Sequence, residues 1–291
     1  MTTGTPPTLG ELAKEGAAWL MSRKVPSARF DAEVLLAHVL GTDRGALLGR
    51  QRESIPPGVE NSFRTLLGRR GDRVPLQHLT GRQEFWSLDF AVDARVLIPR
   101  PETELIVEEV LARVSSESPR IADLGTGSGN IAVALAWELP TARILATDLS
   151  TDALEVARSN AARHGVTARI RFFQGDLAAP LEEAAGPGSL EFLVSNPPYV
   201  AEDELADMEP EVSAHEPLVA LTPGADPLKL YPALLTAGSR FLRSGGHLIL
   251  ELPAGRAEQV AGMARAETTL ELITVRSDYG AIPRVLVARR R

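Results

Sequence analysis

The sequence predicts an α/β protein in which a doubly wound sheet of seven strands, ending in an antiparallel hairpin, follows a small helical domain. From residue 99 onward, short apolar runs alternate with segments of helical periodicity. The early apolar runs are continuous rather than alternating, as expected for parallel strands covered by helices on both faces. The first 75 residues contain helical periodicity and no strand-like run.

Residues 1–75 are assigned to the N-terminal helical domain. Three segments place apolar residues at steps of three and four, and the second ends at Gly41, which suits a helix C-terminus; they are 9–21, 29–41 and 57–71. The pair Arg69 and Arg70 is expected at a solvated helix end. Residues 76–98 mix aromatic and β-branched residues around polar breaks, which predicts a β-hairpin linker between two domains.

Residues 99–291 are assigned to the sheet domain. The predicted strands are 120–125, 142–150, 169–175, 190–195, 246–253, 269–275 and 284–290, and helices are expected at 130–139, 151–165 and 226–242. No helix fits between the last two strands, so they should pair antiparallel. In such a sheet, ligands bind at the carboxyl ends of the strands. The polar segment 206–217 is expected to form a mobile flap over that cleft.

Composition excludes several classes of function. The 291 residues include no cysteine, which rules out disulfides, thiolate nucleophiles and cysteine zinc sites. No signal-peptide pattern and no apolar run of about 18 residues is present, so we expect a cytoplasmic protein without a membrane partner. The five histidines lack metal-ligand spacing, and no metal is expected. The net charge of −7 is concentrated after residue 75, which argues against direct nucleic-acid binding.

A glycine-rich turn lies between the first predicted strand and its helix, in "IADLGTGSGNIAVALA". Its Gly-x-Gly-x-Gly spacing matches neither the dinucleotide fingerprint nor the phosphate-binding P-loop. The turn is introduced by an acidic residue, which suits a ligand with an ammonium group better than a pyrophosphate. The candidate cofactor contacts are Asp123, Gly125, Thr126, Gly127, Ser128 and Gly129.

Two further carboxylates follow strands of the same sheet. Asp148 ends the second strand about 20 residues beyond the turn, where a carboxylate can accept from both ribose hydroxyls. Asp176 follows the third strand and could accept from an adenine amino group, with Leu177 packing near the ring. An adenosyl ligand that carries an amino-acid tail and no phosphate is S-adenosylmethionine, which we predict as the cofactor.

The fourth strand ends in "NPPY", residues 196–199. Pro197 and Pro198 fix the backbone and remove two N–H donors, which leaves the Asn196 side-chain carbonyl and the Pro197 carbonyl as acceptors. A planar NH₂ group has two donors that match this pair, and Tyr199 supplies a face for stacking. Acceptors on both hydrogens raise the electron density at nitrogen and favour methyl transfer to it. Asn196, Pro197 and Tyr199 are therefore the catalytic candidates.

These motifs resemble a known family. "DLGTGSGN" together with "NPPY" is similar to the Rossmann-like class I S-adenosylmethionine-dependent methyltransferases that act on planar NH₂ groups. "QHLTGRQEFW" (77–86), "LIPRPETE" (97–104) and "EPLVAL" (216–221) resemble the peptide chain release factor glutamine methyltransferases, the HemK-like proteins. The resemblance covers essentially the whole chain.

The resemblance implies N5-methylation of the glutamine in the Gly-Gly-Gln motif of bacterial class 1 release factors, with S-adenosylhomocysteine as by-product. It implies that Asn196 contacts the cofactor along with the residues named above, and that the N-terminal domain binds the release factor. The glutamine would be held by Asn196, Pro197, Pro198 and Tyr199, beside a cleft lined by Arg100 and Glu102. We expect a monomer.

Two alternatives remain open on the residues. An adenine-N6 methyltransferase acting on DNA or RNA shares the logic of the Asn-Pro-Pro-Tyr corner, but aromatic residues make up only 5% of this chain. A non-catalytic cofactor-binding scaffold would not require both Asn196 and Asp148.

Overall fold

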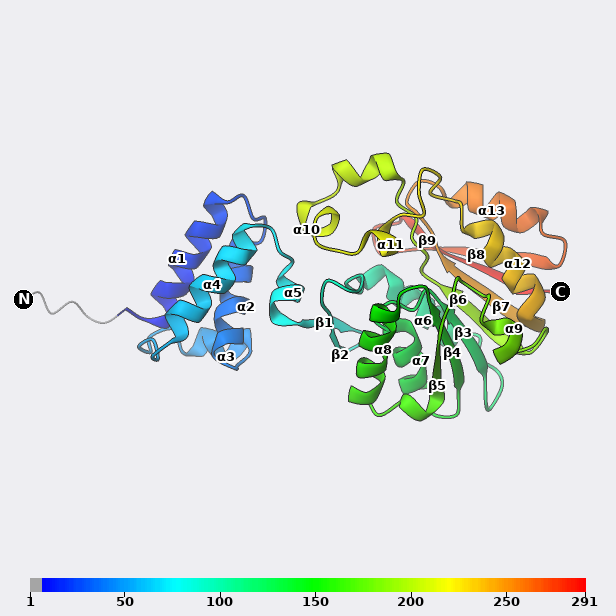
Figure 1. Ribbon diagram of the computed structural model, residues 1–291, viewed down its shortest axis with the longest axis horizontal. Helices are drawn as coiled ribbons and strands as arrows, with labels where there is room; N and C mark the ends of the chain where they lie inside the picture. Colours follow the sequence, from blue (N-terminus) through cyan, green and yellow to red (C-terminus); the bar gives the residue numbers. More distant parts are fainter. Residues whose placement is uncertain (1–6) are drawn as a thin grey trace, which may run out of the picture. The chain divides into compact units, whose positions relative to one another are not determined.

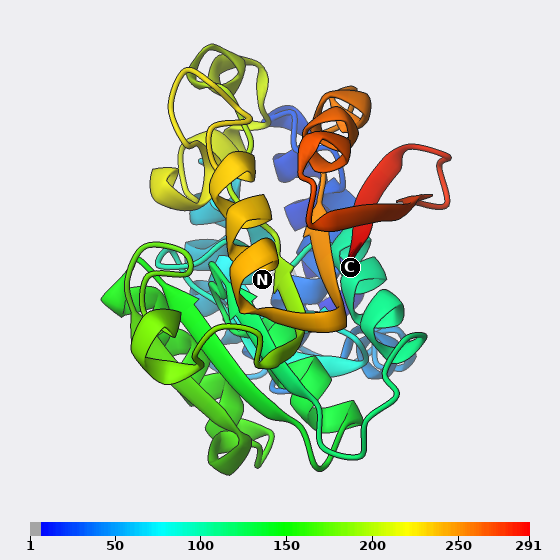
Figure 2. The ribbon, with the colours of Figure 1, turned by 90° about the vertical axis from the view of Figure 1, so that its right-hand side faces the viewer.

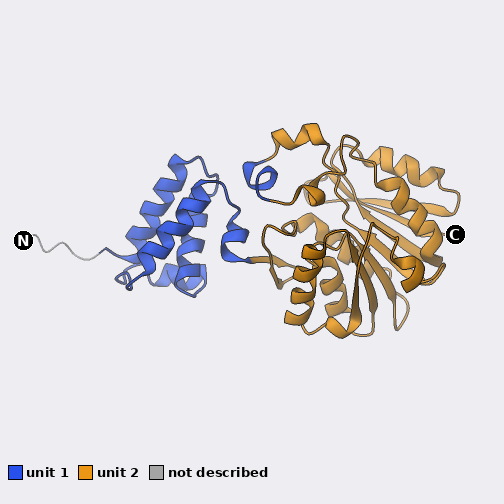
Figure 3. Ribbon diagram, in the orientation of Figure 1, with its two compact units in different colours: residues 1–81, 209–215 blue, residues 82–208, 216–291 orange. Residues whose placement is uncertain are grey.

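The computed structural model describes residues 7–291 and divides into two compact units, coloured separately in Figure 3. The first unit runs to Gly81 and also includes Glu209–His215, and the second comprises Arg82–Met208 and Glu216–Arg291. The chain therefore leaves the second unit after Met208 and returns to it at Glu216. We refer to the first as the helical unit and to the second as the sheet unit.

In the helical unit, the helices of residues 9–80 surround one apolar core, and Figure 1 labels them α1 to α5. The helices of this unit are α1 (Leu9–Ser22), α2 (Ala28–Val39), α3 (Arg44–Gly49), α4 (Val59–Gly71), α5 (Leu76–Thr80) and α10 (Pro210–Ser213). The three helices expected from periodicity correspond to α1, α2 and α4. Thr8 and Glu11 form a reciprocal capping box that starts α1. Gly16 permits the close crossing of α1 and α4, since a Cβ there would lie 2.7 Å from the Phe63 ring.

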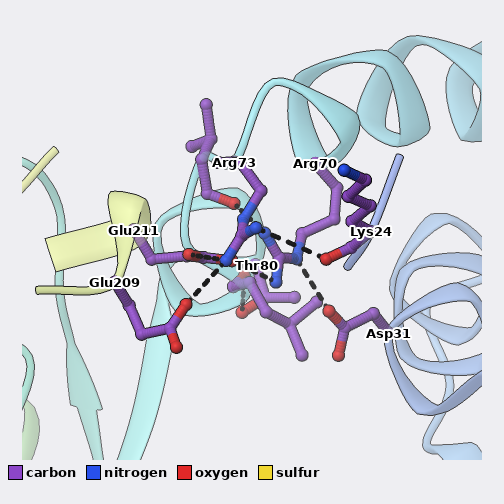
Figure 4. A network of polar contacts seen from close by, with 9 residues as sticks. Lys24, Asp31, Arg70, Arg73, Thr80, Glu209 and Glu211 are labelled. Atoms are coloured by element: carbon purple, nitrogen blue, oxygen red, sulfur yellow. Dashed lines mark hydrogen bonds and ion pairs between the residues drawn. The ribbon is translucent and has the colours of Figure 1, made fainter. Parts of the chain in front are cut away.

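A buried ion-pair network lies inside this unit, as Figure 4 shows. The Arg70 side chain is only 6% exposed; its Nε donates to Asp31 Oδ2 at 2.7 Å and its Nη2 lies 2.8 Å from Glu211 Oε1. Arg73 Nη2 lies 2.6 Å from Glu211 Oε2. The expectation that Arg70 is solvated was wrong, because Asp31 on α2 gives its guanidinium a buried partner. Glu211, within the expected flap, is held by two arginines of this unit.

The sheet unit contains two sheets. A separate hairpin pairs β1 (Arg82–Phe85) with β2 (Leu88–Ala91). The main sheet has seven strands in the order β5-β4-β3-β6-β7-β9-β8. Its strands are β3 (Arg120–Leu124), β4 (Arg143–Asp148), β5 (Ile170–Gln174), β6 (Leu190–Ser195), β7 (Leu242–Glu251), β8 (Leu270–Ser277) and β9 (Pro283–Arg290).

The topology confirms the predicted doubly wound sheet. The pairs β4–β5, β3–β4, β3–β6 and β6–β7 are parallel, whereas β9 is antiparallel to both β7 and β8. The helical segments of this unit are η1 (Pro101–Thr103), α6 (Glu104–Leu111), α7 (Asn130–Glu138), α8 (Thr151–Arg163), η2 (Thr167–Arg169), α9 (Leu181–Ala184), η3 (Glu202–Asp207), α11 (Leu218–Leu221), α12 (Tyr231–Phe241) and α13 (Ala257–Ala266). Across residues 7–291, no helix has the length and apolar character needed to cross a bilayer.

Both faces of the main sheet are covered, and alternate residues of one strand reach different cores. On β7, Ile249 packs into the core that includes α6 and α7, whereas Leu248 and Leu250 pack into the core that includes α12 and α13. Figure 2 shows α12, in yellow-orange, running beside the sheet. This double coverage explains why the strands read as continuous apolar runs. It also leaves the carboxyl ends of the strands as the place where polar side chains gather.

Candidate active site

Four parallel strands bring the predicted motifs to one edge of the sheet. Leu124 of β3 is in register with Thr147 of β4 and with Ser195 of β6, and Asp148 pairs with Gln174 of β5. The residues that follow these positions, including the glycine turn and Asn196, therefore leave the sheet side by side. A cavity of about 350 Å³ lies at this edge, within the size range of small-molecule sites.

Most of the predicted site residues line this cavity. They are Arg100, Gly125, Thr126, Gly127, Ser128, Asp148, Asp176, Leu177, Asn196 and Pro198. Other residues line the cavity although the sequence predicted no individual role for them; they include Val96, Leu97, Pro99, Thr103, Leu149, Pro217, Val219, Ala220, Lys229 and Leu230. Six of these residues belong to the family motifs at 97–104 and 216–221, so the sequence pattern indicated their segments without indicating the individual residues: Leu97, Pro99, Thr103, Pro217, Val219 and Ala220.

The glycine turn is bent back toward the end of β4. Gly125 and Gly127 have φ of +71° and +55°, and a Cβ at either would meet nothing within 4 Å. The restriction to glycine at these two positions is therefore conformational, and it leaves the backbone open to a ligand in the cavity. The amide of Gly127 donates to Asp148 Oδ2 at 2.8 Å. An acidic side chain thus occupies the region where a phosphate-binding loop would offer N–H donors to an anion.

Asp148 is held by the backbone around it. Its Oδ1 accepts from the amide of Ser150 at 2.9 Å, while Oδ2 accepts from Gly127. Burial raises the pKa of Asp148, although these backbone donors oppose the shift. A carboxylate has about four acceptor positions, so this one can still accept from a ligand hydroxyl in addition to its backbone donors. Asp148, Asp176 and Leu177 line one cavity, which fits the residue set expected for an adenosyl ligand.

Asp123 is not brought to the cavity wall. It is fully buried under the turn, and Thr126 Oγ1 donates to its Oδ2 at 2.6 Å. Burial raises the pKa of Asp123 to about 7, with a smaller contribution from the Asp148 charge. The structure gives this residue a role in fixing the turn through Thr126, and a ligand ammonium would act on it through space.

Four other predicted residues also lie outside the cavity lining: Glu102, Gly129, Pro197 and Tyr199. Gly129 has φ of +80° and approaches α8, where a Cβ would lie 3.0 Å from the Ala157 Cβ. Pro197 is buried, whereas Asn196 and Pro198 on either side of it are partly exposed. Tyr199 packs against the core that contains α12, and its hydroxyl donates to Glu251 Oε1 at 2.9 Å.

The Asn-Pro-Pro-Tyr corner begins where β6 ends. Asn196 lines the cavity together with Asp148 and the glycine turn, and its Nδ2 donates to Thr103 Oγ1 at 3.1 Å. Arg100, on the same wall, is paired with the buried Glu216 at 2.6 Å. The cavity therefore combines a nucleoside-sized space with an amide side chain whose NH₂ end is already engaged.

Comparison with known families agrees with this architecture. Residues 101–212 match the model described as "Methyltransferase small domain", and residues 11–81 match "PrmC N-terminal domain". The solved hMettl16 catalytic domain, in complex with MAT2A 3′UTR hairpin 6, superposes with a TM-score of 0.55 at 16% identity. That match covers 76% of this chain and 81% of the other, and it concerns the fold alone. The fold and the cavity define a class I S-adenosylmethionine-dependent methyltransferase.

Two relatives extend over nearly the full chain. The release factor glutamine methyltransferase of Moorella thermoacetica is 42% identical over 98% of this chain and 99% of its own length. The protein of the same name from Chlorobaculum tepidum is 40% identical over 95% of each chain. The chain belongs to the family of release factor glutamine methyltransferases.

Proposed function

We propose that this protein transfers the methyl group of S-adenosylmethionine to the N5 side-chain amide nitrogen of a release-factor glutamine, in the Gly-Gly-Gln motif. One observation carries the proposal: Asn196 lines the same cavity as Asp148 and the glycine turn. An acceptor for a planar NH₂ group therefore lies beside the space that suits an adenosyl ligand.

The residues of the corner act on the substrate nitrogen. An amide nitrogen is a weak nucleophile because its lone pair is delocalised into the carbonyl. The Asn196 Oδ1 and the Pro197 carbonyl would accept its two hydrogens and orient its lone pair toward the methyl donor, and Pro198 keeps the corner rigid. When bound, the cofactor would supply an electrophilic methyl on a sulfonium, with S-adenosylhomocysteine as the by-product. The nitrogen then releases one proton to solvent, which needs no strong base in the site.

The chain's own groups would hold the cofactor. The turn residues 125–128 and Asp148 would meet its amino-acid and ribose parts, and Asp176 and Leu177 its base, since all of them line the cavity. Gly129 lies outside the lining and would only support the turn, where it approaches α8. Arg100 and Glu102 would line the approach of the glutamine, with the Arg100 guanidinium already oriented by Glu216. The N-terminal helical domain is proposed to bind the release factor, with the protein acting as a cytoplasmic monomer and without direct contact to nucleic acid.

A transfer assay with tritiated cofactor distinguishes this proposal from its alternatives. We expect label in a purified class 1 release factor and none in DNA or RNA. Label in nucleic acid alone would favour an adenine-N6 methyltransferase, and cofactor binding without transfer to either would favour a scaffold.

A further inference from the structure

We infer that Glu251 and Thr103 are positioning residues for methyl transfer, which fix the orientation of the Asn196 side-chain amide. The inference rests on the proposed function and adds two residues to it. Glu251 ends β7, on the strand next to the one that leads into Asn196. Its side chain is buried, with the residue only 1% exposed, and it does not line the cavity.

The Glu251 carboxylate accepts from two residues of the site. Its Oε2 accepts from Thr103 Oγ1 at 2.6 Å, and its Oε1 accepts from the Tyr199 hydroxyl at 2.9 Å. Tyr231 donates to the Glu251 backbone carbonyl at 2.7 Å and fixes the main chain at the same point. Both ends of the Asn-Pro-Pro-Tyr corner therefore connect to one carboxylate: Tyr199 directly, and Asn196 through Thr103.

Glu251 determines which groups donate and which accept in the series of hydrogen bonds from Glu251 through Thr103 to Asn196. Burial raises the pKa of Glu251, and the hydrogen bonds from Thr103 and Tyr199 oppose that shift by favouring the ionised form. Both oxygens accept in this structure, and an ionised carboxylate can only accept, so the single proton of the Thr103 hydroxyl is committed to it. What remains on Thr103 Oγ1 is lone pairs, which require a donor from Asn196. The Asn196 Nδ2 supplies that donor at 3.1 Å. The opposite rotamer would place Asn196 Oδ1 against an oxygen with no proton between them.

The direction of these hydrogen bonds determines which atom of the Asn196 amide is left to interact with a ligand. With Nδ2 engaged by Thr103, Oδ1 is left as the acceptor for a substrate NH₂ group. A flipped amide would present N–H groups to the N–H groups of the glutamine, and the two would repel. Burial, with the neighbouring Glu251 charge, also raises the pKa of the Tyr199 phenol, which therefore stays a neutral donor to Glu251. The network makes the acceptor orientation the favoured one before substrate arrives.

The kinetic test replaces the hydroxyl of Thr103. Thr103→Val keeps the shape but removes the link, and we expect kcat for release-factor methylation to fall about 10- to 100-fold, with cofactor Kd changed less than about threefold. Thr103→Ser restores the hydroxyl and should recover most of the rate. Thr236→Val, at an exposed threonine of α12, is the matched control and should behave as wild type.

Glu251→Gln separates polarity from packing. Glutamine fills the same volume, but its NH₂ group can donate to Thr103 or Tyr199. The direction of the hydrogen bonds that lead to Asn196 would then be reversed. We expect a loss of kcat comparable to that of Thr103→Val. A Glu251→Gln enzyme with wild-type kcat would show that only volume matters at this position and would overturn the inference.

An NMR measurement tests the network independently of activity. In protein labelled with ¹⁵N-asparagine, the Asn196 side-chain NH₂ signals, assigned by their loss in Asn196→Ala, should shift in Thr103→Val and stay in place in Thr236→Val. Unmoved signals would overturn the inference whether or not release factor is a substrate. If the signals shift but wild type does not label release factor, the proposed function fails while the amide network stands.

Discussion

At the scale of single residues, the proposed mechanism depends on oriented acceptors and requires no base in the site. The Asn196 side-chain nitrogen donates to Thr103, which leaves the side-chain oxygen as an acceptor. Asp148 presents lone pairs because backbone amides already hold its two oxygens in place. Both side chains are held in place by the protein and keep acceptor capacity for a ligand. Substitutions here should therefore separate binding from chemistry.

Asn196→Ala should abolish methyl transfer while leaving the fold intact. Loss of one oriented hydrogen-bonding group in a catalytic site lowers kcat by about 100- to 1,000-fold. Initial rates with saturating release factor, together with a thermal melt, measure both parts. Retention of more than about a tenth of the wild-type kcat would contradict the role given to Asn196.

Asp148→Ala should mainly weaken cofactor binding. Charge-assisted hydrogen bonds contribute about 1.5–3 kcal/mol, so the Kd for S-adenosylmethionine should rise about 10- to 100-fold. Titration calorimetry measures this directly. Asp152→Ala, at an exposed aspartate in the first turn of α8, is the control and should leave Kd unchanged. An unchanged Kd in Asp148→Ala would remove this residue from the cofactor site.

Asp123 should make stability depend on pH. Its pKa is raised to about 7 by burial, so the folded protein retains a proton that the unfolded chain releases above about pH 4. The folded state therefore binds more protons between these values, and the contribution of this group to the free energy of unfolding falls as pH rises through the window. The slope is at most about 1.4 kcal/mol per pH unit.

The check is urea unfolding of wild type and Asp123→Asn at several pH values. The stability of wild type relative to the variant should decline from about pH 4 to about pH 7 and level off above that. A difference that stays constant with pH would show that Asp123 is ionised throughout.

At the scale of elements, contacts between segments far apart in the sequence determine the features that the local sequence pattern could not predict. The strands, the glycine turn and the Asn-Pro-Pro-Tyr corner could be predicted because each depends on neighbours in the sequence. Thr103 and Glu251 could not be paired in advance, since they lie 148 residues apart. Arg70 reads as a surface residue from "LGRRG", and only the packing of α2 against α4 gives it Asp31 as a partner. The sequence pattern predicts that Asp123 contacts a ligand, but in the structure the residue is fully buried and does not line the cavity.

The ion pair between α2 and α4 gives a prediction at this scale. Arg70→Met leaves Asp31 buried without its partner, which costs about 3–5 kcal/mol. Native-state hydrogen exchange of α2 and α4 amides should report that loss. Arg64→Met, on the same helix with exposed partners, should cost less than about 1 kcal/mol. Equal protection in both variants would mean that the buried pair contributes no more than a surface one.

At the scale of the whole molecule, the chain joins a helical unit to a methyltransferase sheet with different charge and composition. The acidic excess lies in the part that carries the cavity, which suits a cationic cofactor and a protein substrate better than a nucleic acid. The segment Glu209–His215 belongs to the helical unit, while the residues on either side of it belong to the sheet unit. Pro217, Val219 and Ala220 line the cavity just after the chain returns to the sheet unit.

We propose that the corner at Asn196 makes a glutamine carboxamide nitrogen accept a methyl group. Tandem mass spectrometry of a class 1 release factor, incubated with this protein and S-adenosylmethionine, tests it most directly. We predict one added methyl, located on the side-chain nitrogen of the glutamine in Gly-Gly-Gln and absent when Asn196→Ala replaces wild type. An unmodified glutamine with wild-type protein, or a methyl on any other atom, would contradict the claim.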